Sequence, residues 1–323
     1  MANTTIPAGL VKKVWASKVY KEGKKASFFD RFTGKNGSNI IDLSEDTKKA
    51  KGDQVTFSIA MALKGAGTVG NNATLRGNEE AFVLKDFTVK TELVRHAVVR
   101  SEADDQKTEI EMLPEIKQAL VDSFANWQDD QFIAKLSAAP TAGETMYGGA
   151  AASVGALTAN DKLTCALIAK AKRKAKMHAP KVKPLKIDGE DKYIMLVGTW
   201  AARDLKADPA WQQAQASANN RGSSNPIFSG SLGEYDGVIL YEYERVLNTA
   251  NGASSANVVS NLLLGQQAAC YAVSRDMKHI KQEDDYGNVQ GNGVSFYGSI
   301  TKTQFDSKDY GVINVLTGGA VEA

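Results

Sequence analysis

The chain has 323 residues, 43% of them hydrophobic, which is enough to bury one large core or two ordinary ones. Its 39 Lys and Arg nearly balance 37 Asp and Glu, and a formal net charge of +2 excludes a strong overall attraction to nucleic acid or membrane. Two cysteines, Cys165 and Cys270, are too few for a disulfide framework and indicate a reducing compartment. No apolar window predicts a signal peptide or a membrane span, so we expect a cytoplasmic product.

The first 35 residues are strongly basic. They contain eight Lys and Arg against Glu22 and Asp30, a net charge of +6. Their few large apolar residues are Val11, Val14, Trp15, Val19 and the cluster Phe28, Phe29 and Phe32. This composition predicts an extended arm that becomes ordered only when it packs on another surface. A merely frayed terminus is the alternative interpretation.

Two segments follow in which large apolar residues alternate with small or polar ones. This pattern predicts half-buried strands. The first contains Val55, Phe57, Ile59, Met61 and Leu63, and the second contains Phe87, Val89, Thr91 and Leu93. Residues 64–80 between them are rich in Gly and Asn, so we expect a long hairpin whose tip has little core of its own. Because isolated hairpins are only marginally stable in water, this one is expected to pack against a partner. A hairpin packed on its own domain is the alternative.

Residues 102–136 are predicted to form a long helix, because apolar side chains recur along one face. These are Leu113, Ile116, Leu120, Phe124, Trp127, Phe132 and Leu136. Pro114 is expected to start or kink the helix. Residues 102–130 hold nine acidic residues against two lysines, so the outward face should be anionic and could pair with the basic arm of another subunit. An acidic face that is simply solvated is the alternative.

The Gly-rich stretch 138–155 is predicted to connect two structural units. Thr158 and Asp161 resemble a capping box for a second helix that ends near Met177. Further strands and helices predict an α+β unit and then a set of returning strands. The strands are expected at 193–197, 238–243, 258–264, 270–273 and 294–305, the helices at 200–206 and 211–218, and a turn at 284–292.

No motif for catalysis or cofactor binding stands in the context that its chemistry needs. Gly65, Gly67 and Gly70 spell a dinucleotide-binding fingerprint, but no helix is predicted after them to receive a pyrophosphate. The three histidines lack metal-ligand spacing, and His96 is interpreted as structural. The basic run at 170–176 is the best signal for nucleic acid, although its lysines do not form one stripe. We therefore expect no catalytic residue, no cofactor and no metal.

Five blocks, colinear along the chain, resemble the family of major capsid proteins typified by the podovirus N-four. They are GDQVTFSIAMALKGAG at 52–67, LRGNEEAF at 75–82, DLKADPAWQQA at 204–214, NPIFSGSLGEYDGVILYEYERV at 225–246 and LLLGQQAACYAV at 262–273. The resemblance implies the tailed-phage capsid fold of the Hong Kong 97 type. It also implies a structural, non-enzymatic protein of the virion, assembled in the cytoplasm of the host bacterium.

The resemblance further implies how the chain divides and what it contacts. Residues 1–34 would be the N-terminal arm, 35–93 the extended loop, 94–140 with 258–323 the peripheral domain that contains the spine helix, and 141–257 the axial domain. Copies would form pentamers and hexamers around double-stranded DNA held by non-specific contacts, with portal and with scaffolding or decoration proteins as partners. Any scaffold is expected to be a separate protein. Candidate subunit contacts are Lys12, Lys13, Trp15, Phe57, Ile59, Lys64, Arg76, Glu109, Glu111 and Glu115.

Three other functions remain open from the sequence. An encapsulin-like shell that holds cargo enzymes would use the same fold. A nucleic-acid-binding module would use residues 170–176 and would bind DNA with a steep dependence on salt. An enzyme on an α+β scaffold ranks last, because no motif supports it.

Overall fold

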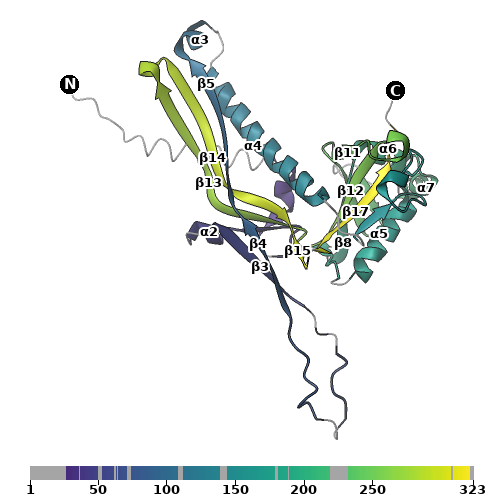
Figure 1. Cartoon of the computed structure of the whole chain (residues 1–323). Coiled ribbons are helices and arrows are strands. Elements are labelled where there is room, and N and C mark those ends of the chain that lie inside the picture. Colours follow the sequence, from purple (N-terminus) through teal and green to yellow (C-terminus); the bar gives the residue numbers. More distant parts are fainter. Residues whose placement is uncertain are drawn as a thin grey trace.

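The computed structural model of the chain shows two bodies and a projecting hairpin (Figure 1). It describes residues 27–35, 37–49, 53–61, 63, 65–70, 74–107, 112–138, 144–178, 181–187, 189–218, 232–306 and 308–320. Most of the described elements match the predicted ones within a few residues. The strand predicted at 270–273 is much longer, Ala269–Asp284, and the strand predicted at 294–305 spans Val289–Lys302. The other differences, given below, concern one helix cap and long-range pairing.

The first body is a five-stranded sheet with a long helix packed on it. The strand order is β1-β2-β13-β14-β5, in which β13 and β14 form a long antiparallel pair and β5 is an edge. Its strands are β1 (Thr33–Gly34), β2 (Ile41–Ser44), β5 (Glu92–Ser101), β13 (Ala269–Asp284) and β14 (Val289–Lys302). Its helices and 3-10 turns are η1 (Phe28–Phe32), α2 (Asp46–Lys49), α3 (Glu102–Lys107), α4 (Met112–Ser137) and η6 (Asp285–Gly287).

Helix α4 confirms the predicted helix from Met112 onward and its apolar face, whereas Glu102–Lys107, at the start of the predicted range 102–136, form a helix of their own, α3. Ile116, Leu120, Phe124, Phe132 and Leu136 are buried, and their spacing of three or four residues places them on one side of the helix. Pro114 lies in the first turn, where its missing N–H leaves no helical hydrogen bond unmade.

The second body is a mixed sheet covered by helices. Its main strand order is β6-β17-β12-β8-β10-β9, with β7 paired to β8 and β11 to β12. The strands are β6 (Thr145–Tyr147), β7 (Leu185–Ile187), β8 (Glu190–Val197), β9 (Gly233–Tyr235), β10 (Val238–Glu242), β11 (Asn248–Thr249), β12 (Val258–Leu264) and β17 (Val312–Gly318). The helices and 3-10 turns are η2 (Val154–Ala156), α5 (Cys165–Met177), α6 (Thr199–Lys206), α7 (Pro209–Ala218) and η5 (Ala253–Ser255). Every residue of β17 is buried, as expected for a strand covered on both faces.

Two short pairs complete the fold. Strands β3 (Gln54–Ala60) and β4 (Leu84–Lys90) pair antiparallel, which confirms the predicted hairpin. Strands β15 (Gln304–Phe305) and β16 (Lys308–Asp309) form a small ribbon beside its base. Among the described residues of the predicted loop 35–93, only this hairpin projects. Strand β2 lies inside the first sheet between β1 and β13.

The structure differs from the sequence-based expectations at two other places. The C-terminal strands are divided between the bodies: β13 and β14 lie in the first sheet, whereas β12 and β17 pair with each other and β12 pairs with β8. The N-cap of α5 is Thr164, whose side chain accepts from the Leu167 N–H, so the capping prediction at Thr158 was wrong. Asp161 instead accepts from the Thr158 N–H and hydroxyl, which closes a local turn.

Candidate subunit interface

The hairpin is anchored at its base by aromatic and ionic contacts. Phe57 of β3 stacks on Phe87 of β4, with ring centroids 5.4 Å apart, and Phe305 of β15 meets Phe87 edge-on at 5.3 Å. Lys85 forms an ion pair with Asp306, the residue that follows β15. The base is therefore held to its own subunit by burial and by one cross-element ion pair.

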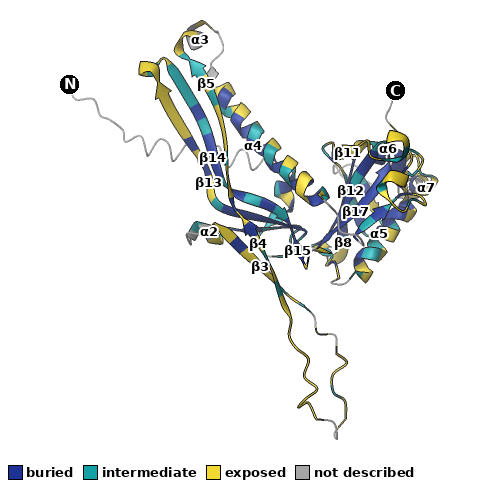
Figure 2. Ribbon diagram, viewed as in Figure 1, coloured by how far each residue is buried: buried dark blue, intermediate teal, exposed yellow. Residues whose placement is uncertain are grey.

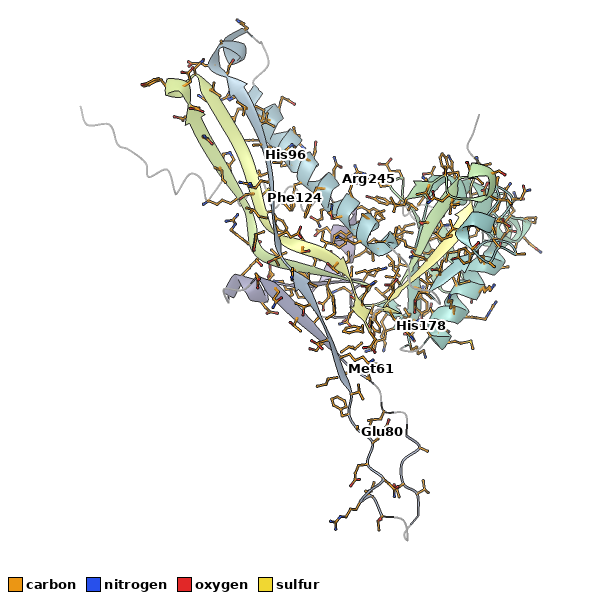
Figure 3. The ribbon with its side chains drawn as sticks, viewed as in Figure 1. Met61, Glu80, His96, Phe124, His178 and Arg245 are labelled. Carbon is orange, nitrogen blue, oxygen red and sulfur yellow. The ribbon has the colours of Figure 1, made fainter. Side chains whose placement is uncertain are left out.

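Beyond this base the hairpin leaves the body with exposed apolar side chains. Leu63, Leu75, Phe82 and Leu84 are 62–68% exposed. Figure 2 colours nearly the whole extension as exposed, and Figure 3 shows Met61 and Glu80 on its two arms. The two arms remain connected, because the Met61 N–H donates to the Val83 carbonyl (3.0 Å) and the Gly65 N–H to Glu80 Oε2 (2.7 Å). Such a row of large apolar groups is typical of a surface that another chain covers.

The glycines of the former dinucleotide-binding candidate lie in this extension. Gly67 and Gly70 have φ values of +71° and +105°, and each would have open space around an added Cβ. Both backbone angles lie in the left-handed region, which only glycine adopts readily without strain. They do not precede a helix among the described residues, so the fingerprint lacks its phosphate site.

The described part of the arm is locked onto α4 by one buried carboxylate. Asp129 accepts from the Ser27 hydroxyl (2.6 Å), the Phe28 N–H (3.0 Å) and the Phe29 N–H (3.4 Å). Phe29 is fully buried and packs on Phe132 at 5.0 Å. We call Ser27 to Phe32 the arm root. It fixes where the arm leaves the subunit.

The arm root corrects two expectations. Phe28, Phe29 and Phe32 were assigned to an arm that settles on another surface, but Phe29 and Phe32 are buried in the core of their own chain and Phe28 stacks on Tyr243 at 4.4 Å. Asp129 was counted in the outward anionic face, but it is only 7% exposed. Burial of Phe29 and Phe32, stacking of Phe28 and the hydrogen bonds to Asp129 decide the path of this segment, and the net charge of the arm does not.

The remaining exposed acids of α4 lie on a narrow ridge. Glu115, Asp122 and Asp130 are exposed, and Asp130 Oδ1 accepts from Arg245 Nη1 at 3.0 Å. Arg245 also donates to the side chain of Asn126 (2.5 Å), so the second body is tied to α4 near its exposed side (Figure 3). The ridge is anionic but partly neutralised from within the chain.

The candidate contact residues fall into separate regions. Lys12, Lys13, Trp15, Lys64, Glu109 and Glu111 lie outside the described residues. Phe57 and Ile59 share one face of β3 and are half-buried, Arg76 is exposed in the hairpin extension, and Glu115 is exposed in the first turn of α4. The structure therefore brings only Phe57 and Ile59 together. Sequence reasoning missed the arm root, for which the aromatic cluster at 28–32 was the available signal.

The other candidate chemistries find little support in the described residues. Lys172 pairs with Asp236 (2.8 Å) and Lys174 donates to the Thr145 carbonyl (2.8 Å), so part of the basic run is engaged within the chain. No group of three metal-binding side chains gathers in the described part of the chain. None of the described helices combines the length and the apolar character needed to cross a membrane. Burial raises the pKa of both thiols, Cys165 and Cys270, to about 12, which keeps them protonated and inert.

Comparison with known proteins distinguishes between these candidate functions. A family model described as phage capsid protein matches residues 3–148 and 138–321, which together are nearly the whole chain. The chain belongs to the phage capsid protein family. Its role is accordingly structural and not enzymatic, and its place is the virion, as the sequence predicted.

Individual relatives agree with this family assignment. The chain is 27% identical to the major capsid protein of Pseudomonas phage KPP25, with 94% of each chain covered. It matches the capsid of Ralstonia phage GP4 with 26% identity, a TM-score of 0.81 and 92% of each chain covered. The capsid of cyanophage Pam1 matches over 100% of both chains with a TM-score of 0.81 and 23% identity, which bears on the fold alone. The predicted Hong Kong 97 type fold is confirmed.

Proposed function

We propose that the chain is the major capsid protein of a tailed phage, and that its copies assemble as pentamers and hexamers into an icosahedral head around double-stranded DNA. The observation that carries this proposal is the hairpin extension, whose apolar side chains are 62–68% exposed in the isolated subunit. A neighbouring subunit is the natural cover for such a surface. Contacts with the DNA would be non-specific, and portal and scaffolding or decoration proteins would be further partners.

The proposed domains follow the two bodies and not the predicted boundaries. The peripheral domain comprises the five-stranded sheet with α4, and the axial domain comprises the second sheet with α5 to α7. In this division β12 and β17 belong to the axial domain, because they pair with each other and β12 pairs with β8. The arm before residue 27 and the hairpin between β3 and β4 would reach neighbouring subunits.

Membership of the N-four-type subgroup is a finer proposal. It rests on the five colinear blocks between residues 52 and 273. A cryo-electron microscopy structure of the head would test it. An inter-subunit arrangement closer to that of N-four heads than to that of GP4 heads is expected, and the opposite ranking would contradict it.

Electron microscopy and sedimentation of the purified protein test the function itself. Closed shells, tubes or rings of five or six subunits are expected as concentration rises. Replacing Phe82 and Leu84 together by serine should abolish these assemblies and leave the subunit folded, because both side chains are exposed in the subunit. Thr88→Ser, a change at an exposed polar position of the same hairpin, is the matched control. Assembly of the double variant at the wild-type concentration would contradict the role of the hairpin.

A further inference from the structure

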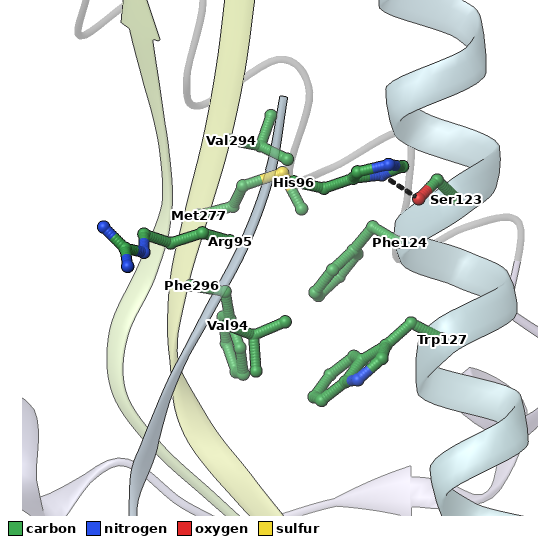
Figure 4. A pocket seen from close by; sticks show the side chains of 9 residues that line it. All are labelled: Val94, Arg95, His96, Ser123, Phe124, Trp127, Met277, Val294 and Phe296. Atoms are coloured by element: carbon green, nitrogen blue, oxygen red, sulfur yellow. Dashed lines mark hydrogen bonds between the residues drawn. The ribbon is translucent and has the colours of Figure 1, made fainter. Parts of the chain in front are cut away.

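A pocket of about 180 Å³ opens between α4 and the edge strand β5 (Figure 4). Its walls are mainly apolar and include Val94, Phe124, Trp127, Met277 and Phe296. At its rim His96 Nδ1 and Ser123 Oγ share a hydrogen bond of 2.5 Å. Figure 4 shows the Phe124 and Trp127 rings pointing from the helix toward the strands.

The pocket has the size and the lining to hold an aromatic ring. A dry apolar cavity of about 150 Å³ is known to take up benzene. Phe124 and Trp127 stack with their ring centroids 5.8 Å apart, and Phe296 meets Phe124 edge-on at 5.4 Å. An added ring would extend this cluster, and the Met277 side chain can adapt to its shape.

The arm root lies close by, on the opposite flank of the same helix. Asp129, which holds Ser27, is two residues from Trp127, so the two side chains point about 160° apart around the helix axis. The exposed ridge of Asp122, Asn126 and Asp130 lies between these flanks. A chain that leaves the arm root and crosses this ridge arrives at the mouth of the pocket, after about 15–20 Å around a helix of this diameter.

The residues that precede the arm root suit this route. Residues 1–26 contain six lysines and one acid, Glu22. Because Arg245 already pairs with Asp130, they are attracted to the two other acids of the ridge, Glu115 and Asp122. Trp15 is followed by twelve residues up to Ser27, and such a segment spans up to about 40 Å when extended. The hairpin tip is a poorer occupant, because its two cations, Lys64 and Arg76, are balanced by Glu79 and Glu80.

We propose that, in the unassembled subunit, Trp15 of the same chain occupies the pocket between α4 and β5. The lysines around it lie over the acidic ridge of α4. The inference rests on the proposed function, because the arm must leave the pocket when it reaches a neighbour during assembly. The pocket thus keeps the arm on its own subunit until assembly begins.

Disulfide trapping in dilute, unassembled protein tests this proposal. Ala16→Cys is combined with Ser123→Cys at the pocket rim, or with Lys135→Cys as the matched control. Both partners are six residues from Asp129 along α4, and Lys135 is exposed. The two native thiols do not compete, because they are buried.

The expected result is a bond within one chain between positions 16 and 123 that forms about tenfold faster than the bond between 16 and 135, owing to the higher local concentration. Adding Trp15→Ala should reduce the rate to that of the control pair, whereas Tyr20→Ala should leave it unchanged. Equal rates for the two pairs, disulfides only between chains, or a rate independent of Trp15 would each overturn the proposal.

A second measurement needs no cysteine. The difference between the emission spectra of the natural protein and the Trp15→Phe variant reports Trp15 together with any change at its pocket neighbour Trp127. A blue-shifted component shielded from acrylamide is expected, and a fully quenched, red-shifted component would refute the docking. Electron microscopy separates this inference from the proposed function, and it is done after reduction, because the disulfide would hold the arm in the pocket and block assembly. Shells from variants that never form the intrachain disulfide contradict only the inference, and the disulfide followed by no shells after its reduction contradicts only the function.

Discussion

Replacement of Asp129 by alanine should release the arm root from α4. The carboxylate accepts from the Ser27 hydroxyl at 2.6 Å and from the Phe28 N–H at 3.0 Å, and it is only 7% exposed. Each buried donor left without an acceptor costs about 1–3 kcal/mol. The variant leaves two such donors without an acceptor, but it also removes the cost of burying the carboxylate. The net loss of stability of the closed arm root is about 3 kcal/mol, which raises its open population about a hundredfold.

Native-state proteolysis with chymotrypsin measures this opening, because Phe28, Phe29 and Phe32 become cleavable only when the arm root detaches. When opening and closing are fast, the cleavage rate follows the open population, so Asp129→Ala should be cut about a hundredfold faster. Asp130→Ala is the matched control, since its side chain is 60% exposed and its pair with Arg245 contributes at most about 1 kcal/mol. Cleavage of the two variants at similar rates would refute the role given to the buried carboxylate.

Two further predictions concern ionic contacts. Lys35 and Lys48 donate to Glu45 and lower its pKa from 4.5 to about 2. This stabilisation is complete above about pH 4.5 and is lost as the pH falls through about 2. In urea unfolding followed by circular dichroism, Glu45→Gln should therefore lose stability at pH 7 and lie close to the natural protein near pH 2, and an equal deficit at both pH values would contradict this. Lys302→Met should lower the free energy of unfolding by about 3–5 kcal/mol in the same assay at pH 7, because the negative charge of the buried Asp309 loses its cation. A loss below about 1 kcal/mol would show that this pair is not needed.

Local patterns predicted the individual elements well, because each pattern follows from the geometry of one element. The spacing of Ile116, Leu120 and Phe124 predicted the buried face of α4, and the apolar run of β12 predicted both of its ends. Alternation along β3 and β4 predicted their pairing, since Phe57 lies opposite Phe87 in the register. These features need no knowledge of distant parts of the chain.

Contacts between distant residues were the part that local patterns could not predict. The hydrogen bond from Ser27 to Asp129 joins positions 102 residues apart within one chain, whereas charge counting predicted that the arm and the acidic helix pair between subunits. The division of β12 and β13 between two sheets is decided by their partners β8 and β14, not by their own composition. The cap of α5 was misplaced because Thr158 and Thr164 both precede the helix, and only the backbone path selects Thr164.

The burial gradient along the hairpin bears on how such a shell can form. Val55 and Val89 at the base are buried in their own subunit, whereas Phe82 and Leu84 are more than 60% exposed. Burying one such side chain contributes about 1.5–3 kcal/mol, so the pair contributes about 3–6 kcal/mol before the costs of association. Those costs are of similar size, so a single hairpin contact stays weak and reversible, and stability comes only when several contacts close together. A misplaced subunit can therefore leave a growing shell, while a completed shell is held by all of its hairpins at once.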